Sequence, residues 1–151
     1  MPNWKKGIIL IAVILLVSTG VWLYWTREMP LADALPDEKW DSIRLFLGDV
    51  DSETREWEVS ASADAVLSAI SETRVSRTGR KIRLTDRYFQ LYLYPEIGYP
   101  TVIYVTSSGG IMVAANMDFD HYQYYKCTTE LYVMLSKNFR ICCGSLNPTP
   151  Y

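Results

Sequence analysis

The stretch YFQLYLYPEIGYPTVIYVTSSGGIMVAANMDF, residues 88–119, contains the pattern that decides the fold. In its first part, apolar residues alternate with tyrosine and glutamine, as they do in a strand with one buried face. Residues 101–106 are rich in branched and aromatic residues, which favour strands. The run SSGG at 107–110 is typical of a hairpin turn, because glycine reaches positive φ at little cost. Alternation resumes over 111–119, so the stretch predicts three consecutive antiparallel strands.

The chain on either side of this stretch supplies further strands and two helices. Short alternating runs predict strands at 40–47, 57–59 and 82–84. In two other places apolar residues recur at the three- and four-residue spacing of an amphipathic helix. They are Ala63, Val66, Leu67 and Ile70 in the first helix, and Leu131, Met134, Leu135 and Phe139 in the second. The sequence therefore predicts an α+β domain of two layers, a mostly antiparallel sheet with two helices on one face.

The beginning of the chain has a different character. Residues 7–25, GIILIAVILLVSTGVWLYW, carry no charge, and as a helix they would span roughly 28 Å, close to the ~30 Å hydrocarbon core of a bilayer. Aromatic residues, which prefer the two membrane–water interfaces, flank the run. They are Trp4 at one end and Trp22, Tyr24 and Trp25 at the other. We therefore predict a transmembrane helix over 7–25. The alternative is a cleaved signal peptide, whose apolar run is usually shorter, about 7–15 residues.

The charges beside the apolar run predict its orientation. Lys5 and Lys6 precede the run, and acidic residues dominate the segment that follows it. Because basic residues tend to stay inside, we expect a single-pass protein of the cell membrane with its N-terminus in the cytoplasm. The predicted organisation is a cytoplasmic tail, a transmembrane helix, a linker, an extracytoplasmic domain and a flexible tail, over 1–6, 7–25, 26–39, 40–143 and 144–151.

The net charge of the part beyond the apolar run limits the class of partner. Of the 15 Lys and Arg residues, all but Lys5 and Lys6 follow the run, so 13 remain there against 17 Asp and Glu. A nucleic-acid-binding protein needs a basic surface. The mildly acidic balance therefore argues against nucleic acid as a partner.

The segment TVIYVTSSGGIMVAANMDFDHYQYYKCTTELYVMLSKNF, residues 101–139, resembles the C-terminal part of a small domain of unknown function. That domain occurs on exported or membrane-anchored proteins of Gram-positive bacteria. The residues that carry the resemblance are Tyr122, Tyr124, Glu130, Leu131 and Tyr132. The resemblance covers 39 of the 151 residues of the chain. It implies a location outside the cytoplasm, and it implies no activity.

The stretch DFDHYQYYKC, residues 118–127, is the strongest candidate for chemistry. Cys127 could act as a nucleophile with His121 as its base, oriented by a neighbouring aspartate. This defines one functional hypothesis, an envelope enzyme with a cysteine nucleophile. The spacing argues against it, because the two residues lie six positions apart on a predicted strand or loop, which keeps their side chains well separated. The competing interpretation is that Cys127 is a small buried hydrophobic residue and His121 a polar loop residue.

Metal and disulfide sites are also poorly supported by the sequence. Asp118, Asp120 and His121 offer three ligands, but a structural zinc site normally has four Cys or His ligands. The acidic run at 49–53 lacks the later glycine and glutamate of a calcium loop. We therefore expect no metal and no cofactor. Cys127 and Cys142 flank a predicted helix and would be too far apart to pair, so no stable intramolecular bridge is predicted.

Two surface features are candidates for binding. The first is the face of the 88–94 strand that carries Tyr88, Gln90, Tyr92 and Tyr94. This face would be open to solvent if the helices cover the other one, and tyrosine suits binding surfaces because it is rigid and has a polar tip. Ordinary cross-strand aromatic pairing explains the same pattern without a ligand.

The second feature is the basic segment at 74–83, RVSRTGRKIR. It could contact anionic lipid headgroups or a cell-wall polymer, or it could be a solvated loop. Its candidate contact residues are Arg77, Arg80, Lys81 and Arg83. Together, these features favour a membrane-anchored extracytoplasmic interaction module without catalytic activity. Its predicted partners are the lipid bilayer and an envelope protein or anionic polymer.

Overall fold

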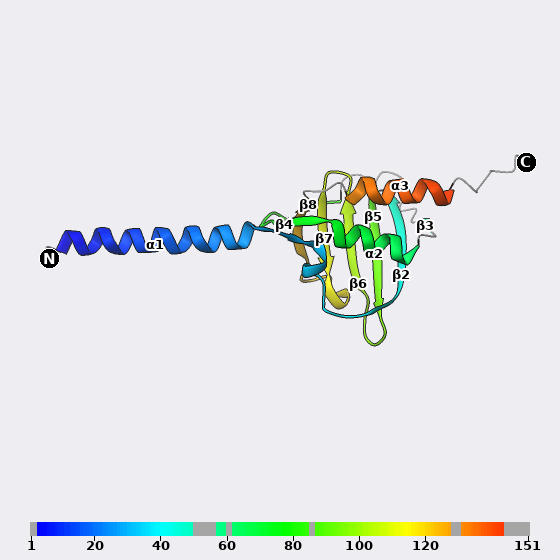
Figure 1. Cartoon of the computed structure of the whole chain (residues 1–151), viewed down its shortest axis with the longest axis horizontal. Coiled ribbons are helices and arrows are strands. Elements are labelled where there is room, and N and C mark those ends of the chain that lie inside the picture. Colours follow the sequence, from blue (N-terminus) through cyan, green and yellow to red (C-terminus); the bar gives the residue numbers. More distant parts are fainter. Residues whose placement is uncertain (1–2, 50–56, 60–61, 85–86, 128–130, 144–151) are drawn as a thin grey trace, which may run out of the picture.

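The computed structural model describes residues 3–49, 57–59, 62–84, 87–127 and 131–143 (Figure 1). Its helices are α1 (Asn3–Thr26), α2 (Ala63–Glu72) and α3 (Leu131–Cys143), and its 3-10 helices are η1 (Leu31–Ala34) and η2 (Ala115–Met117). The strands are β1 (Glu28–Pro30), β2 (Trp40–Asp49), β3 (Trp57–Val59), β4 (Arg74–Arg77), β5 (Arg87–Pro95), β6 (Thr101–Thr106), β7 (Gly110–Ala114) and β8 (Gln123–Cys127). Helix α1 projects away from a two-layer domain that holds all the other elements.

The strands form one sheet in the order β1-β4-β8-β7-β6-β5-β2-β3. Every neighbouring pair of strands is antiparallel. Helices α2 and α3 lie together on one face of this sheet. The α+β architecture predicted from the sequence is therefore confirmed, including the three consecutive antiparallel strands β5, β6 and β7.

The core lies between the helices and the sheet. Apolar side chains of neighbouring strands are in register, so they point to the same face of the sheet. Leu45, Leu91, Ile103 and Val113 are directly opposite one another across β2, β5, β6 and β7. All four are at most 2% exposed. Since side chains point alternately to the two faces of a sheet, one row of this kind fixes which face every other residue occupies.

Helix α1 is long and apolar enough to cross a membrane, as the sequence predicts. None of its apolar stretch is covered by the domain. The same length and composition would also satisfy a signal sequence.

The segment between α1 and β2 differs from the predicted linker. Within 26–39, β1 pairs with β4 and η1 packs under α2. Leu31 is completely buried in the core, and its N–H donates a hydrogen bond of 2.8 Å to the carbonyl of Thr73. The elements are only three and four residues long, too short to show a periodicity among acidic neighbours.

Three further boundaries differ from those predicted. The first part of the basic segment is strand β4, which begins directly after α2, rather than a loop. Residues 81–84 form no strand. Strand β7 ends at Ala114 instead of continuing to Phe119, because Asn116 and Met117 adopt positive φ angles of 53° and 56°. Positive φ is costly for these residue types in a strand, so the chain turns there.

Candidate functional site

The predicted tyrosine face lies opposite the helices, but much of it is not open to solvent. Tyr88 is 7% exposed and Gln90 is 3% exposed, so the prediction of exposure was wrong for both. The amide nitrogen Nε2 of Gln90 donates hydrogen bonds of 2.7 Å and 2.8 Å to the hydroxyls of Tyr92 and Tyr104. A polar residue at this position therefore serves as the centre of a packed aromatic layer, which explains why the pattern resembles a solvent-facing one.

The aromatic layer is closed by residues from the turn that follows η2. Tyr122 contacts three other rings, with centroid separations of 6.0–6.2 Å to Phe119, Tyr104 and Tyr124. Burial raises the pKa of Tyr104 and, to a smaller extent, that of Tyr122. Both phenols therefore stay neutral at physiological pH. Of the predicted binding face, only Tyr92 and Tyr94 remain half exposed; their rings stack at 6.2 Å.

The basic segment forms a distinct surface feature, which we call the cationic hollow. It has a volume of about 530 Å³ and is lined by the turn between β6 and β7, by β8 and by the segment after β4. Its charged lining residues are Arg80, Lys81, Arg83 and Lys126. No carboxylate lines it among the described residues. Sequence reasoning found three of these cations and missed Lys126, which only the sheet brings next to them.

One apolar contact holds this segment against the sheet. Gly110 begins β7, and a Cβ atom there would lie 2.9 Å from Cγ2 of Ile82. The absence of a side chain thus lets Ile82 sit directly on the strand. Arg80, Lys81 and Arg83 on either side of Ile82 remain exposed. The segment is a strap with one apolar residue turned inward and the basic residues turned to solvent.

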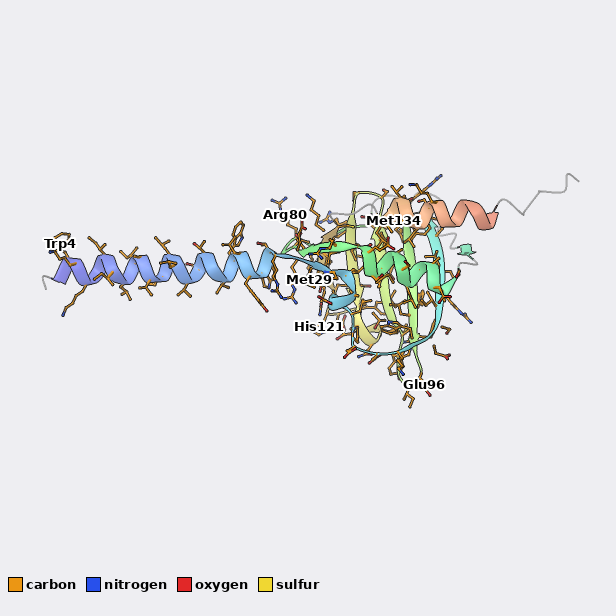
Figure 2. All side chains as sticks on the ribbon, viewed as in Figure 1. Trp4, Met29, Arg80, Glu96, His121 and Met134 are labelled. Atoms are coloured by element: carbon orange, nitrogen blue, oxygen red, sulfur yellow. The ribbon has the colours of Figure 1, made fainter. Side chains whose placement is uncertain are left out.

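Arg77, the remaining predicted basic residue, lies at a different site. It lines a pocket of about 350 Å³ between the end of α1 and the ends of β4 and β8, which we call the junction pocket. Trp25, Gly79, Tyr122 and Tyr124 also line it. Figure 2 shows Arg80 and Met29 on the same side of the domain, which faces the end of α1. The structure therefore divides the predicted basic residues between two adjoining sites.

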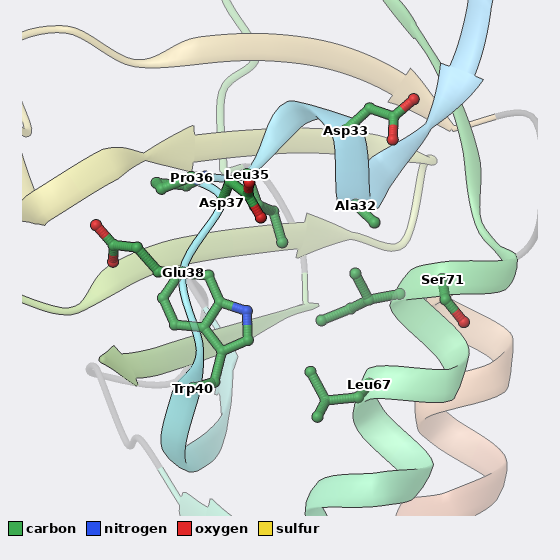
Figure 3. Close-up of a pocket in the computed structure, with 10 residues that line it drawn as sticks. Ala32, Asp33, Leu35, Pro36, Asp37, Glu38, Trp40, Leu67 and Ser71 are labelled. Carbon is green, nitrogen blue, oxygen red and sulfur yellow. The ribbon is translucent and has the colours of Figure 1, made fainter. Parts of the chain in front are cut away.

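A third hollow was not predicted (Figure 3). It is a groove of about 630 Å³ between α2 and the segment 32–40. Trp40 and Leu67 face it from opposite sides, and the carboxylates of Asp33, Asp37 and Glu38 lie around its rim. The sequence predicts that most of this segment is a linker, and a linker gives no indication of a groove.

The structure does not assemble the hypothetical cysteine site. His121 precedes β8 and Cys127 ends it, so an extended strand separates them by more than ~13 Å at about 3.3 Å per residue. The His121 side chain is 83% exposed, and its Nδ1 lies 3.0 Å from Oδ2 of Asp118 in the same turn. Cys127 is a half-buried thiol. The two residues therefore cannot act as a nucleophile and its base in this conformation.

Metal binding finds no geometric support within the described ranges. No three His, Cys, Asp or Glu side chains gather there as a ligand set. The acidic run at 49–53 lies largely outside the described residues. The side chains of Cys142 and Cys143 also lie outside them, so the predicted absence of an intramolecular disulfide stays a prediction.

Comparison of the chain with protein-family models, curated proteins and solved structures finds no match. The functional argument therefore depends on the surfaces of this molecule.

Proposed function

We propose that the protein is a single-pass membrane-anchored interaction module, with its N-terminus in the cytoplasm and its α+β domain outside. In this proposal the domain binds an anionic partner of the envelope, either a polymer or an acidic face of another protein. The cationic hollow is the contact surface.

The observation that carries the proposal is the composition of that hollow. Four cations gather around one concavity that no described carboxylate lines, on a chain whose acidic residues outnumber its basic ones beyond α1. Arg80, Lys81, Arg83 and Lys126 form no ion pair with any described carboxylate. Concentrated like charge destabilises a fold modestly and attracts anions, so such a cluster favours a binding surface.

Charge also suggests how the partner would bind. Rim charges that are not desolvated contribute mainly to the association rate and to specificity. The half-buried Ile82 and the turn at 107–110 also line the hollow and would supply closer contacts with the partner. We therefore expect binding that weakens steeply with salt.

Membrane anchoring and topology are tested first. A phosphatase reporter that is active only outside the cytoplasm is fused to the C-terminus, and the intact mass of the mature protein is measured in parallel. An active reporter on an uncleaved chain supports the proposal. A mature mass that lacks the apolar run, or an inactive reporter, contradicts it.

Partner binding is tested by site-directed photocross-linking in intact cells. A photoreactive amino acid replaces Ser108, which is exposed at the rim of the cationic hollow, or Ile97, which is 89% exposed on the distant β5–β6 hairpin as the control. The proposal expects an adduct from Ser108 that is lost on Arg80→Glu and retained on Lys137→Glu. The same adducts from both positions, or no effect of Arg80→Glu, would refute it.

A further inference from the structure

The junction between α1 and the domain has no free linker. Helix α1 ends at Thr26 and strand β1 begins at Glu28, so Arg27 alone separates them. Strand β1 is held in the sheet by its pairing with β4, in which Glu28 faces Ser76. Gly79 also lies against the end of α1, because a Cβ atom there would be 4.0 Å from the indole of Trp25. The position of the domain relative to the helix end is therefore defined by direct packing.

Two arginines meet at this junction. Arg27 and Arg77 line the same small hollow together with Tyr24 and Trp25. The guanidinium of Arg27 lies 4.6 Å from the ring centroid of Tyr24, a cation–π contact that orients it. Neither arginine forms an ion pair with a carboxylate of the described part of the chain. Two neighbouring positive charges without a carboxylate create a site that favours an anion.

The junction pocket extends this site with groups that bind phosphate. Arg77 contributes a planar fork of N–H donors, of which part is engaged in a hydrogen bond with the Tyr125 hydroxyl. Thr78 and the rings of Tyr122 and Tyr124 also line the pocket. The turn at Thr78 is fixed, because its N–H donates a hydrogen bond of 3.0 Å to the carbonyl of Tyr124. Arginine recognises phosphate oxygens in bidentate fashion, and aromatic walls shield them from water. No Asp or Glu lines the pocket among the described residues.

The position of the pocket relative to the bilayer indicates which kind of molecule would supply the phosphate. Tryptophan at the end of a transmembrane helix sits at the headgroup level of the bilayer. Because Trp25 is both the last aromatic residue of α1 and a wall of the pocket, the pocket opens at that level when α1 spans the membrane. A phosphodiester at this depth belongs to a phospholipid.

We propose that the junction pocket, with Arg27 and Arg77, binds the phosphodiester of an anionic phospholipid in the leaflet from which the domain emerges. This inference rests on the proposed membrane anchoring of α1. The bound lipid would hold the domain at one tilt on the membrane surface, with the cationic hollow beside the headgroups, since Thr78 lines both sites.

The test uses the full-length protein released from detergent micelles in a native mass spectrometer, after equilibration with equal amounts of phosphatidylglycerol and phosphatidylcholine. The wild type is expected to retain one phosphatidylglycerol in preference to phosphatidylcholine. Arg77→Gln should weaken that retention about tenfold, the typical effect of losing one charge-assisted hydrogen-bonding group. Lys137→Gln, an exposed cation on α3, is the control and should leave it unchanged.

A second pair of variants keeps the test independent of folding effects. Gly79 lies at the pocket wall, and a Cβ atom there would meet only the Trp25 indole, at an ordinary contact distance of 4.0 Å. Gly79→Glu places a carboxylate beside Arg77 and should abolish the preference for phosphatidylglycerol. Gly79→Gln has the same shape without the charge and should retain it. Circular dichroism of each variant reports whether the fold is intact.

Three results would overturn the proposal. They are equal retention of the two lipids by the wild type, equal retention of phosphatidylglycerol by all variants, and displacement of the lipid by millimolar inorganic phosphate. The last would identify a site for free anions. A chain cleaved after α1 would instead refute the proposed anchoring, and the intact mass reveals that outcome separately.

Discussion

The contact between Gly48 and Tyr88 predicts that Gly48→Ala lowers the free energy of unfolding when the Tyr88 ring is present and does not lower it when the ring is absent. The two residues face each other across β2 and β5, and the Tyr88 ring lies over the Gly48 backbone. A Cβ atom on Gly48 would collide with the Cζ atom of Tyr88 and would lie 2.5 Å and 2.6 Å from two other atoms of that side chain. These separations are far below van der Waals contact, so Gly48→Ala must displace the ring.

The cost of that displacement can be estimated from what the ring contacts. Tyr88 is 7% exposed and its centroid lies 5.9 Å from that of Tyr104. Overpacking typically costs about 1–3 kcal/mol, and a lost aromatic pair contributes roughly 0.5–1.5 kcal/mol. Alanine itself is favoured over glycine within a strand by roughly 0.5–1 kcal/mol. We therefore expect Gly48→Ala to lower the free energy of unfolding by about 1–3 kcal/mol.

The same substitution should become harmless once the ring is removed. In a Tyr88→Ala background, Gly48→Ala is expected to be neutral or to stabilise by up to about 1 kcal/mol, because only the strand preference remains. The assay is urea unfolding of the full-length chain in micelles, followed by near-ultraviolet circular dichroism. Gly79→Ala is the glycine control, because a Cβ atom there would make only an ordinary 4.0 Å contact with the Trp25 indole. An equal loss in both backgrounds would refute the proposed steric cause.

Three further predictions concern the core and the aromatic layer. Leu31→Ala should lower the free energy of unfolding by about 2–5 kcal/mol, as for a buried leucine, and a loss below about 0.5 kcal/mol would show that the segment is a linker after all. Gln90→Leu should cost roughly 1–3 kcal/mol by leaving the Tyr92 and Tyr104 hydroxyls without their partner, measured by the same urea assay, and no change would contradict the network. Because burial raises the pKa of Tyr104 and Tyr122, the folded state holds these protons more tightly than the unfolded state. The contribution of these two groups should therefore be constant below about pH 10, and stability should fall above it, whereas stability unchanged beyond pH 10 would exclude this linkage.

The sequence predicted the elements whose side chains alternate or recur over several turns. The row from Leu45 to Val113 follows from period-two patterns in four strands, and α2 and α3 follow from apolar stripes. Elements of three or four residues carry no such signal. For this reason the sequence predicts a linker where η1 and the buried Leu31 lie, and it offers a loop where β4 lies.

The sites were harder to predict because they depend on which segments the sheet brings together. Alternation correctly placed Tyr88 and Gln90 on the face without helices, but it could not show that the chain after η2 covers that face. The basic segment was visible as a charge cluster, yet its division between two sites arises from the position of Trp25 and Lys126. The alternation of residue types in the sequence predicts which face of the sheet a side chain occupies. Whether that face is exposed depends on which distant segments pack against it.

The distribution of charge supports one orientation of the domain above others. Beyond α1 the chain is acidic overall, so an anionic membrane would repel it in most orientations. Acidic residues such as Asp33, Asp37 and Glu38 border the groove beside α2, whereas the lining of the junction pocket and of the cationic hollow is basic. In the proposed anchoring, the junction arginines are also the cations of the domain that lie nearest to the bilayer, because they adjoin the end of α1. Repulsion of the acidic surfaces and attraction of these arginines therefore act in the same direction, and both should weaken together as salt shortens the ~8–10 Å screening length.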